Sequence, residues 1–272
     1  MVRIDFGTQF ETQPAVALAR HGRIIVKATD CPSGGTGQCD VGIARLRPDG
    51  GLDTKFGDRG KATSPTFWRR FGGCAGSHSD GQNVDSMALD SRRRIVALLT
   101  CARRNPALAR FKSNGNLDRS FGKHGTVFKD LDMGAVASVA TDSRNRIDVA
   151  GSRPNGFAVA RFRPNGELDH SFGKKGMATA RFARNPKGQS VPYSLALDSR
   201  GRIVAGGALG STRQPGAAGA FARFTHKGHV NRRFGQRGTV NVNLGLRLVA
   251  SLAIDSRNRI VGAGNVIVRL LG

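Results

Sequence analysis

Three aspartates of this sequence stand in a repeated motif, LDxxFG, and carboxylates at a fixed spacing could bind calcium. They are Asp53, Asp118 and Asp169. A calcium loop needs oxygen ligands at alternate positions, which this motif lacks, and Asn231 replaces the aspartate in a fourth copy. We therefore expect these side chains to cap turns, with the phenylalanine of the motif packed between repeats.

The remaining carboxylates show no arrangement typical of catalysis. Glycoside hydrolysis needs two or three carboxylates that converge on one bond, and no pair outside the repeated turns has such a setting. The six histidines show no metal-ligand spacing. We expect no catalytic residue, no metal and no cofactor, which favours a binding protein over an enzyme. The acidic residues outside the repeated turns are Asp30, Asp40, Asp80, Asp85, Asp130 and Asp132.

Arginines at equivalent positions are the first candidates for binding. The segments DSRRR, DSRNR, DSRGR and DSRNR each carry an arginine two residues after an aspartate. Guanidinium groups bind phosphates and carboxylates through two parallel hydrogen bonds, so a set of them could hold an anionic polymer. The alternative is that the aspartates pair with neighbouring arginines and only shape the turns. The candidate arginines are Arg92, Arg144, Arg200 and Arg257.

Two aromatic residues are further candidates. Trp68 and Tyr193 are the only residues of their types, and both fall in segments whose length varies between repeats. Variable loops on a rigid scaffold often carry binding sites. Exposed rings in such loops could stack on sugars or bases; the alternative is that each ring anchors its loop.

Four cysteines could form two disulfides. Cys31 and Cys39 bracket one loop, and Cys74 and Cys101 fall in two loops that a four-stranded meander places at the same end. The pairings Cys31–Cys39 and Cys74–Cys101 would indicate an oxidising compartment, hence a secreted or cell-surface protein. A zinc site fits this spacing poorly, and reduced, buried cysteines are the other alternative. The start MVRIDFG shows no signal peptide.

These residues belong to a block that returns five times along the chain. It reads xAxDSRxRI, then a segment ending in AR(F/L), then xxGxLDxxFGxxG. A period of about 40–60 residues with several short strands is typical of propeller blades. In one copy, residues 194–198 and the following RIVAGG form a tight hairpin, 221–224 a third strand and 238–244 a fourth. We predict an all-β, five-bladed β-propeller with four antiparallel strands per blade.

The hairpin xALDSRxRIVxAG, the A-R-F strand and the turn GxLDxSFGxxG resemble the delta-60 repeat family of bacterial proteins, over nearly the whole chain. The pattern is more distantly similar to the NHL-repeat propellers, in which an FGxxG turn precedes an apolar strand ending in Asp. The resemblance implies a β-propeller and implies no reaction.

The repeats fill the chain, so we predict one domain over residues 1–272 and a monomer. The last repeat, near residues 251–270, has three strands, and residues 7–12 follow a degenerate Phe6-Gly7 motif. We expect residues 7–12 to be the outer strand of the last blade, because this pairing would close the ring and remove exposed sheet edges. The alternative is five blades of a larger ring.

A net charge of +24, from 43 basic and 19 acidic side chains, points to an anionic partner: polysaccharide, nucleic acid or an anionic membrane surface. The alternative is a solvated surface with no dedicated partner. No apolar run is long enough for a transmembrane segment. The preferred function is a non-catalytic, secreted or surface-associated binding module. A polysaccharide hydrolase or lyase and a nucleic-acid-binding propeller are the alternatives, and the scarcity of aromatics among the basic residues weakens the latter.

Overall fold

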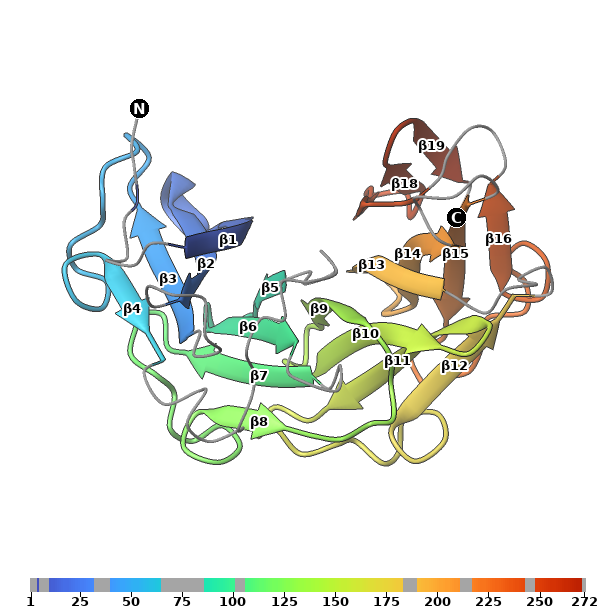
Figure 1. Cartoon of the computed structure of the whole chain (residues 1–272), viewed down its shortest axis with the longest axis horizontal. Helices are drawn as coiled ribbons and strands as arrows, with labels where there is room; N and C mark the ends of the chain where they lie inside the picture. Colours follow the sequence, from blue (N-terminus) through green and yellow to red (C-terminus); the bar gives the residue numbers. More distant parts are fainter. Residues whose placement is uncertain are drawn as a thin grey trace. The chain divides into compact units, whose positions relative to one another are not determined.

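The computed structural model describes residue 4 and residues 10–31, 40–64, 86–100, 106–182, 190–210, 217–242 and 248–270. Within these ranges the regular elements are strands and one short 3-10 turn, and the strands form five antiparallel sheets (Figure 1). Each sheet corresponds to one copy of the repeat, which confirms the all-β class. The chain divides into two compact units, each described below by itself. The single-domain arrangement stays a prediction.

The first unit comprises residues 1–131, 143–145 and 164–167 and holds two sheets. In each, the strands pair in the order of the sequence, so every connection is a hairpin. The first sheet contains β1 (Phe10–Leu18), β2 (Ile24–Cys31), β3 (Asp40–Leu46) and β4 (Lys61–Thr63), with the 3-10 turn η1 (Arg20–Gly22) between β1 and β2. The second contains β5 (Ser86–Leu89), β6 (Ile95–Thr100), β7 (Pro106–Phe111) and β8 (Thr126–Phe128).

The second unit comprises residues 132–142, 146–163 and 168–272 and holds three sheets with the same meander order. The third sheet contains β9 (Val136–Thr141), β10 (Ile147–Arg153), β11 (Gly156–Phe162) and β12 (Met177–Arg181). The fourth contains β13 (Ser190–Leu197), β14 (Ile203–Leu209), β15 (Ala218–Phe224) and β16 (Thr239–Val242). The fifth contains β17 (Ser251–Ile254), β18 (Ile260–Ala263) and β19 (Ile267–Leu270).

The N-terminal strand pairs differently from the prediction. Residues 7–9 lie outside the described ranges, but Phe10 to Thr12 pair with Cys31 to Thr29 of β2, in the first sheet rather than the last. The register shifts between Thr12 and Ala15, where Pro14 falls. Proline cannot donate to a strand ladder, so it is found at such irregularities. The bulge lets β1 continue through Pro14 as a longer inner strand, and the predicted pairing of residues 10–12 with the last repeat is wrong.

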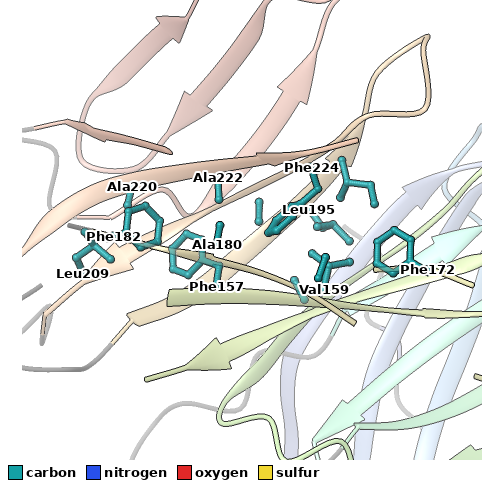
Figure 2. Close-up of a cluster of buried hydrophobic side chains, with 14 residues drawn as sticks. Phe157, Val159, Phe172, Ala180, Phe182, Leu195, Leu209, Ala220, Ala222 and Phe224 are labelled. Carbon is teal, nitrogen blue, oxygen red and sulfur yellow. The ribbon is translucent and has the colours of Figure 1, made fainter. Parts of the chain in front are cut away.

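Within each unit, the core lies between the faces of successive sheets. In the second unit, one cluster joins side chains of β10 and β11 to those of β14 and β15, with Phe157 and Phe182 in edge-to-face contact at 4.8 Å (Figure 2). Ala205 of β14 belongs to this cluster, whereas its neighbour Val204 packs into the next one, toward β18. Middle strands are therefore buried on both faces, which explains their unbroken apolar sequence.

Successive repeats are joined by an arginine and a glycine. In the first sheet, the Nη1 of Arg45 donates to the carbonyl of Ser113 at 2.6 Å, and the N–H of Gly57 donates to that of Asn114 at 2.7 Å. Both acceptors belong to the GxLD turn of the second sheet. The guanidinium also lies over the ring of Phe56, 4.7 Å from its centroid. Equivalent contacts run from Arg110 to Pro164 and from Arg161 to His226.

Candidate anion-binding turns and pocket

The hairpin turns DSRxR are organised by their aspartate. Asp90 Oδ1 accepts from the backbone N–H of Arg92 and Arg94, at 2.9 and 2.8 Å, and its Oδ2 accepts from Arg94 Nε at 2.6 Å. The same three bonds occur at Asp198 and Asp255. Asp142 pairs with Arg146 in the same way. The last arginine of each motif therefore stabilises the turn, as the alternative interpretation of the sequence expected.

The first arginine of each motif has a different position. Its backbone takes part in the turn, while the residue as a whole is exposed. Because the aspartate is already satisfied by the other arginine, this side chain is not needed for the turn. The four residues are the predicted candidates Arg92, Arg144, Arg200 and Arg257.

Neighbouring hairpin turns are linked in pairs. Ser91 donates from its N–H and Oγ to Asn145 Oδ1 at 2.9 and 2.8 Å, which ties the second turn to the third. Ser199 makes the same two bonds to Asn258, which ties the fourth turn to the fifth. Each unit therefore contains one pair of linked turns, and each turn of a pair carries one exposed arginine.

The first repeat departs from this pattern. Ala19 takes the place of the aspartate and Arg20 that of the serine. His21 and Gly22 both have positive φ, +59° and +67°, which is the backbone of a type I′ turn rather than the aspartate-capped turn of the other repeats. Arg23, with no aspartate at position 19, turns toward the LDxxFG turn of its own sheet instead.

Asp53 of that LDxxFG turn accepts two arginines. Arg23 Nε and Arg45 Nε each lie 2.9 Å from Asp53 Oδ2. Burial opposes the charge on Asp53, but the hydrogen bond from Arg23, the charge of Arg45 and the N–H of Lys55 outweigh it and hold the pKa of this carboxyl below its usual value. Its Oδ1 accepts the N–H of Lys55, and Asp118, Asp169 and Asn231 cap their turns alike, which confirms the turn-capping prediction.

A cavity of about 440 Å³ opens where the first and second hairpin turns face each other. Arg20, His21 and Arg93 are exposed around it, and Arg23 and Arg45 border it while bound to Asp53. Among the described lining residues Asp90 is the only acidic one, and it already accepts three hydrogen bonds from its own turn. The described lining residues therefore carry more positive than negative charge. The apolar lining residues of the cavity are Leu18, Ala19, Ile25, Leu89 and Ile95.

The other predicted residues have mixed outcomes. Tyr193 lies within β13, at the register shift between Pro192 and Ser194, and is partly buried, so its predicted loop position is wrong. Trp68, Cys39, Cys74 and Cys101 lie outside the described residues, and only the backbone of Cys31 is described. The disulfides and an aromatic binding role therefore stay predictions.

In the described part of the chain, no group of three or more His, Cys, Asp or Glu could hold a metal, and no helix is long and apolar enough to cross a membrane.

Sequence reasoning missed one buried ion pair. Arg161 and Asp148 are 1% and 0% exposed, and two hydrogen bonds of 2.7 and 2.8 Å join them. Asp148 follows the SRNRI motif, where the other repeats have isoleucine or valine. That single charged residue in an apolar strand was the available signal.

Comparison with known proteins supports this architecture. A family model described as a domain of unknown function (DUF5122) β-propeller matches residues 103–121 and 145–172. No curated protein matches the sequence.

Solved structures of similar fold are distant in sequence. A NanB sialidase from Streptococcus pneumoniae is 9% identical with a TM-score of 0.54, and the match covers 94% of this chain and 56% of that one. A virginiamycin B lyase from Staphylococcus aureus is 8% identical with a TM-score of 0.49, covering 98% and 87%. A glucose dehydrogenase is 13% identical with a TM-score of 0.49, covering 91% and 78%. An identity as low as that to the sialidase bears on the fold alone. With the family match and the sheet topology, the chain is a β-propeller whose five sheets correspond to about five blades.

Proposed function

We propose that this β-propeller is a non-catalytic binding module for an anionic polymer, in line with the delta-60 repeat resemblance, which implies no reaction. The observation that carries the proposal is the different position of the two arginines in the DSRxR turns. One arginine satisfies the aspartate, and an equivalent arginine stays exposed in four successive turns. The exposed arginine of each turn lies at the surface, where an anionic polymer can contact it.

The electrostatics favour the same function. The chain carries +24 net charge, and in each unit Ser–Asn bonds link two turns that each carry an exposed arginine. A polyanion that neutralises several guanidinium groups releases its counterions, so affinity falls steeply with salt, with a slope of roughly −0.9 per phosphate on duplex DNA. A secreted or cell-surface location, with the predicted disulfides, belongs to this proposal.

The test replaces Arg92, Arg144, Arg200 and Arg257 together by alanine and measures the salt at which the protein elutes from immobilised heparin. We expect earlier elution than for the parent. The matched control replaces four exposed basic residues outside the hairpin turns, Arg119, Lys129, Arg181 and Arg232, and so removes the same charge.

The outcome distinguishes a dedicated surface from net charge. Elution of the control close to the parent, with the hairpin variant well below both, supports the proposal. Equal losses in the two variants, or no loss in the hairpin variant, contradict it. A duplex DNA column run beside heparin decides between polysaccharide and nucleic acid.

A further inference from the structure

The cavity between the first and second hairpin turns is lined by residues that differ from those at the equivalent positions of the other repeats. Where other adjacent turns are tied by a serine and an asparagine, as in Ser91–Asn145, this junction has Arg20 and Arg93 at the equivalent positions. Two guanidinium groups cannot hydrogen-bond each other, since both only donate. This junction therefore lacks the Ser–Asn bonds, and the cavity lies between its two turns.

Among the described residues, the two exposed arginines of the cavity have no acidic partner. Ala19 removes the carboxylate that the other hairpin turns carry at this position. Neither Arg20 nor Arg93 has an ion pair within the described part of the chain, and Asp90 is bound to Arg94. Two exposed guanidinium groups that line one cavity, beside a carboxylate already bound by its own turn, offer planar, paired donors to an anion.

The cavity also has an apolar side. Leu18, at the end of β1, lines it and is 78% exposed, and Ile25, Leu89 and Ile95 line it from β2, β5 and β6. Val16, two residues before Leu18 on the same face of β1, is 64% exposed. A large exposed aliphatic side chain beside a cavity gains free energy when an apolar group covers it. A volume of about 440 Å³ lies within the range of small-molecule sites.

We propose that this cavity binds a small amphiphilic anion: a carboxylate held by Arg20 and Arg93, on an aliphatic body that covers Leu18 and Ile25. The site uses other residues than the polymer-binding arginines, so the two proposals stand independently. The ligand is identified by its chemistry, an anionic head of one charge and a short apolar chain.

The experiment uses the whole chain with octanoate as the probe, and isothermal titration calorimetry as the measurement. Acetate has the head without the body, and octanol has the body without the head. We expect octanoate to bind at one site per chain, and acetate and octanol to bind about tenfold more weakly or less, since each lacks one set of contacts.

Two variants restore the pattern of the other repeats and so should fold. Arg20→Ser with Arg93→Asn supplies the serine and asparagine that tie other turns together, and Ala19→Asp supplies the missing carboxylate. Each should weaken octanoate binding about tenfold or more, the loss expected when a charge-assisted hydrogen bond is removed or a like charge is added. Melting temperatures of both variants confirm that they are folded.

The matched control is Arg119→Ser with Arg232→Asn, which removes two exposed guanidinium groups that neither line the cavity nor belong to the hairpin turns. Binding within twofold of the parent supports the proposal. The proposal is wrong if octanoate does not bind, if the control loses as much affinity as Arg20→Ser with Arg93→Asn, or if acetate binds as well as octanoate. Heparin elution of the same variants reports separately on the polymer-binding proposal.

Discussion

At the scale of single residues, the arginine near the end of the third strand of a sheet has different hydrogen-bond partners in different repeats. Arg45 and Arg110 donate from Nε to the aspartate of their own LDxxFG turn, at 2.9 Å in each case. In the fourth repeat Asn231 replaces this aspartate. The buried Nε of Arg223 has no hydrogen-bond partner among the described residues. Burial and the charge of Arg202 lower the pKa of Arg223. The fourth repeat therefore holds a buried guanidinium without the carboxylate that its equivalents use.

Asn231→Asp should stabilise the protein. The new carboxylate would keep the turn-capping bond to the N–H of Arg233 and could accept the free Nε of Arg223, as in the first two repeats. We expect a gain of about 1–2 kcal/mol in the free energy of unfolding, the scale of a charge-assisted hydrogen bond. Urea denaturation measures it. The control is Asn165→Asp, which adds the same charge to an exposed turn residue. Equal effects of the two changes would show that only net charge matters.

At the scale of elements, successive sheets meet through turns as well as through side chains. Gly228 of one turn approaches Gly173 of the preceding repeat so closely that a Cβ atom would lie 2.5 Å from its backbone nitrogen. Gly115 approaches Gly57 in the same manner. Because both contacting groups are backbone, no side-chain movement can make room for a larger residue. This explains why the sequence of this turn varies least between repeats.

Gly228→Ala should therefore destabilise the second unit strongly. The residue has φ of +83° and no room for a methyl group, so we expect a loss of about 2–4 kcal/mol from strained backbone and overpacking. Gly201→Ala is the matched control, with φ of +68° but its nearest neighbour 3.6 Å from the new Cβ. Its equivalents are Arg93, Asn145 and Asn258, so the backbone tolerates a side chain there. Similar losses in the two variants, by thermal denaturation, would refute the role of the close approach.

Elements defined by local sequence were predictable, and those defined by distant partners were not. The hairpins, the turn caps and the buried phenylalanines follow from spacings of a few residues, and they were predicted. Pairing of Phe10–Thr12 is a choice between two sheets that the local sequence does not encode. The cavity was also missed, because it is lined by residues of two repeats, such as Arg20 of the first and Arg93 of the second. Composition predicted a basic protein but could not separate structural arginines from exposed ones.

At the scale of the whole molecule, basic side chains far outnumber acidic ones, so the loss of one carboxylate charge increases an already large net positive charge. The 19 acidic side chains face 43 basic ones. In several turns the pKa of the carboxyl lies below its usual value: at Asp118 and Asp169 burial opposes the charge, but hydrogen bonds from Ser120 and Ser171, with nearby arginines, outweigh it. At Asp255 the backbone N–H of Arg259 is the main cause of the lowered pKa. Protonation would remove these bonds and increase the net positive charge together.

Stability should consequently fall in acid. A carboxyl whose folded pKa is lowered contributes stability that is present above its unfolded pKa and lost as pH falls through the folded value. With an unfolded value near 3.8 for Asp53 and its equivalents, the free energy of unfolding should change little down to about pH 5 and drop below about pH 4. Urea denaturation across this range measures the free energy of unfolding.

Added salt should relieve only the repulsion between cations, because hydrogen bonds to buried carboxylates are screened little. Asp53→Asn should flatten the acid slope, whereas Asn at the exposed Asp58 should leave it unchanged. A slope that salt abolishes, and that Asp53→Asn leaves intact, would assign the acid sensitivity to net charge rather than to the capped turns.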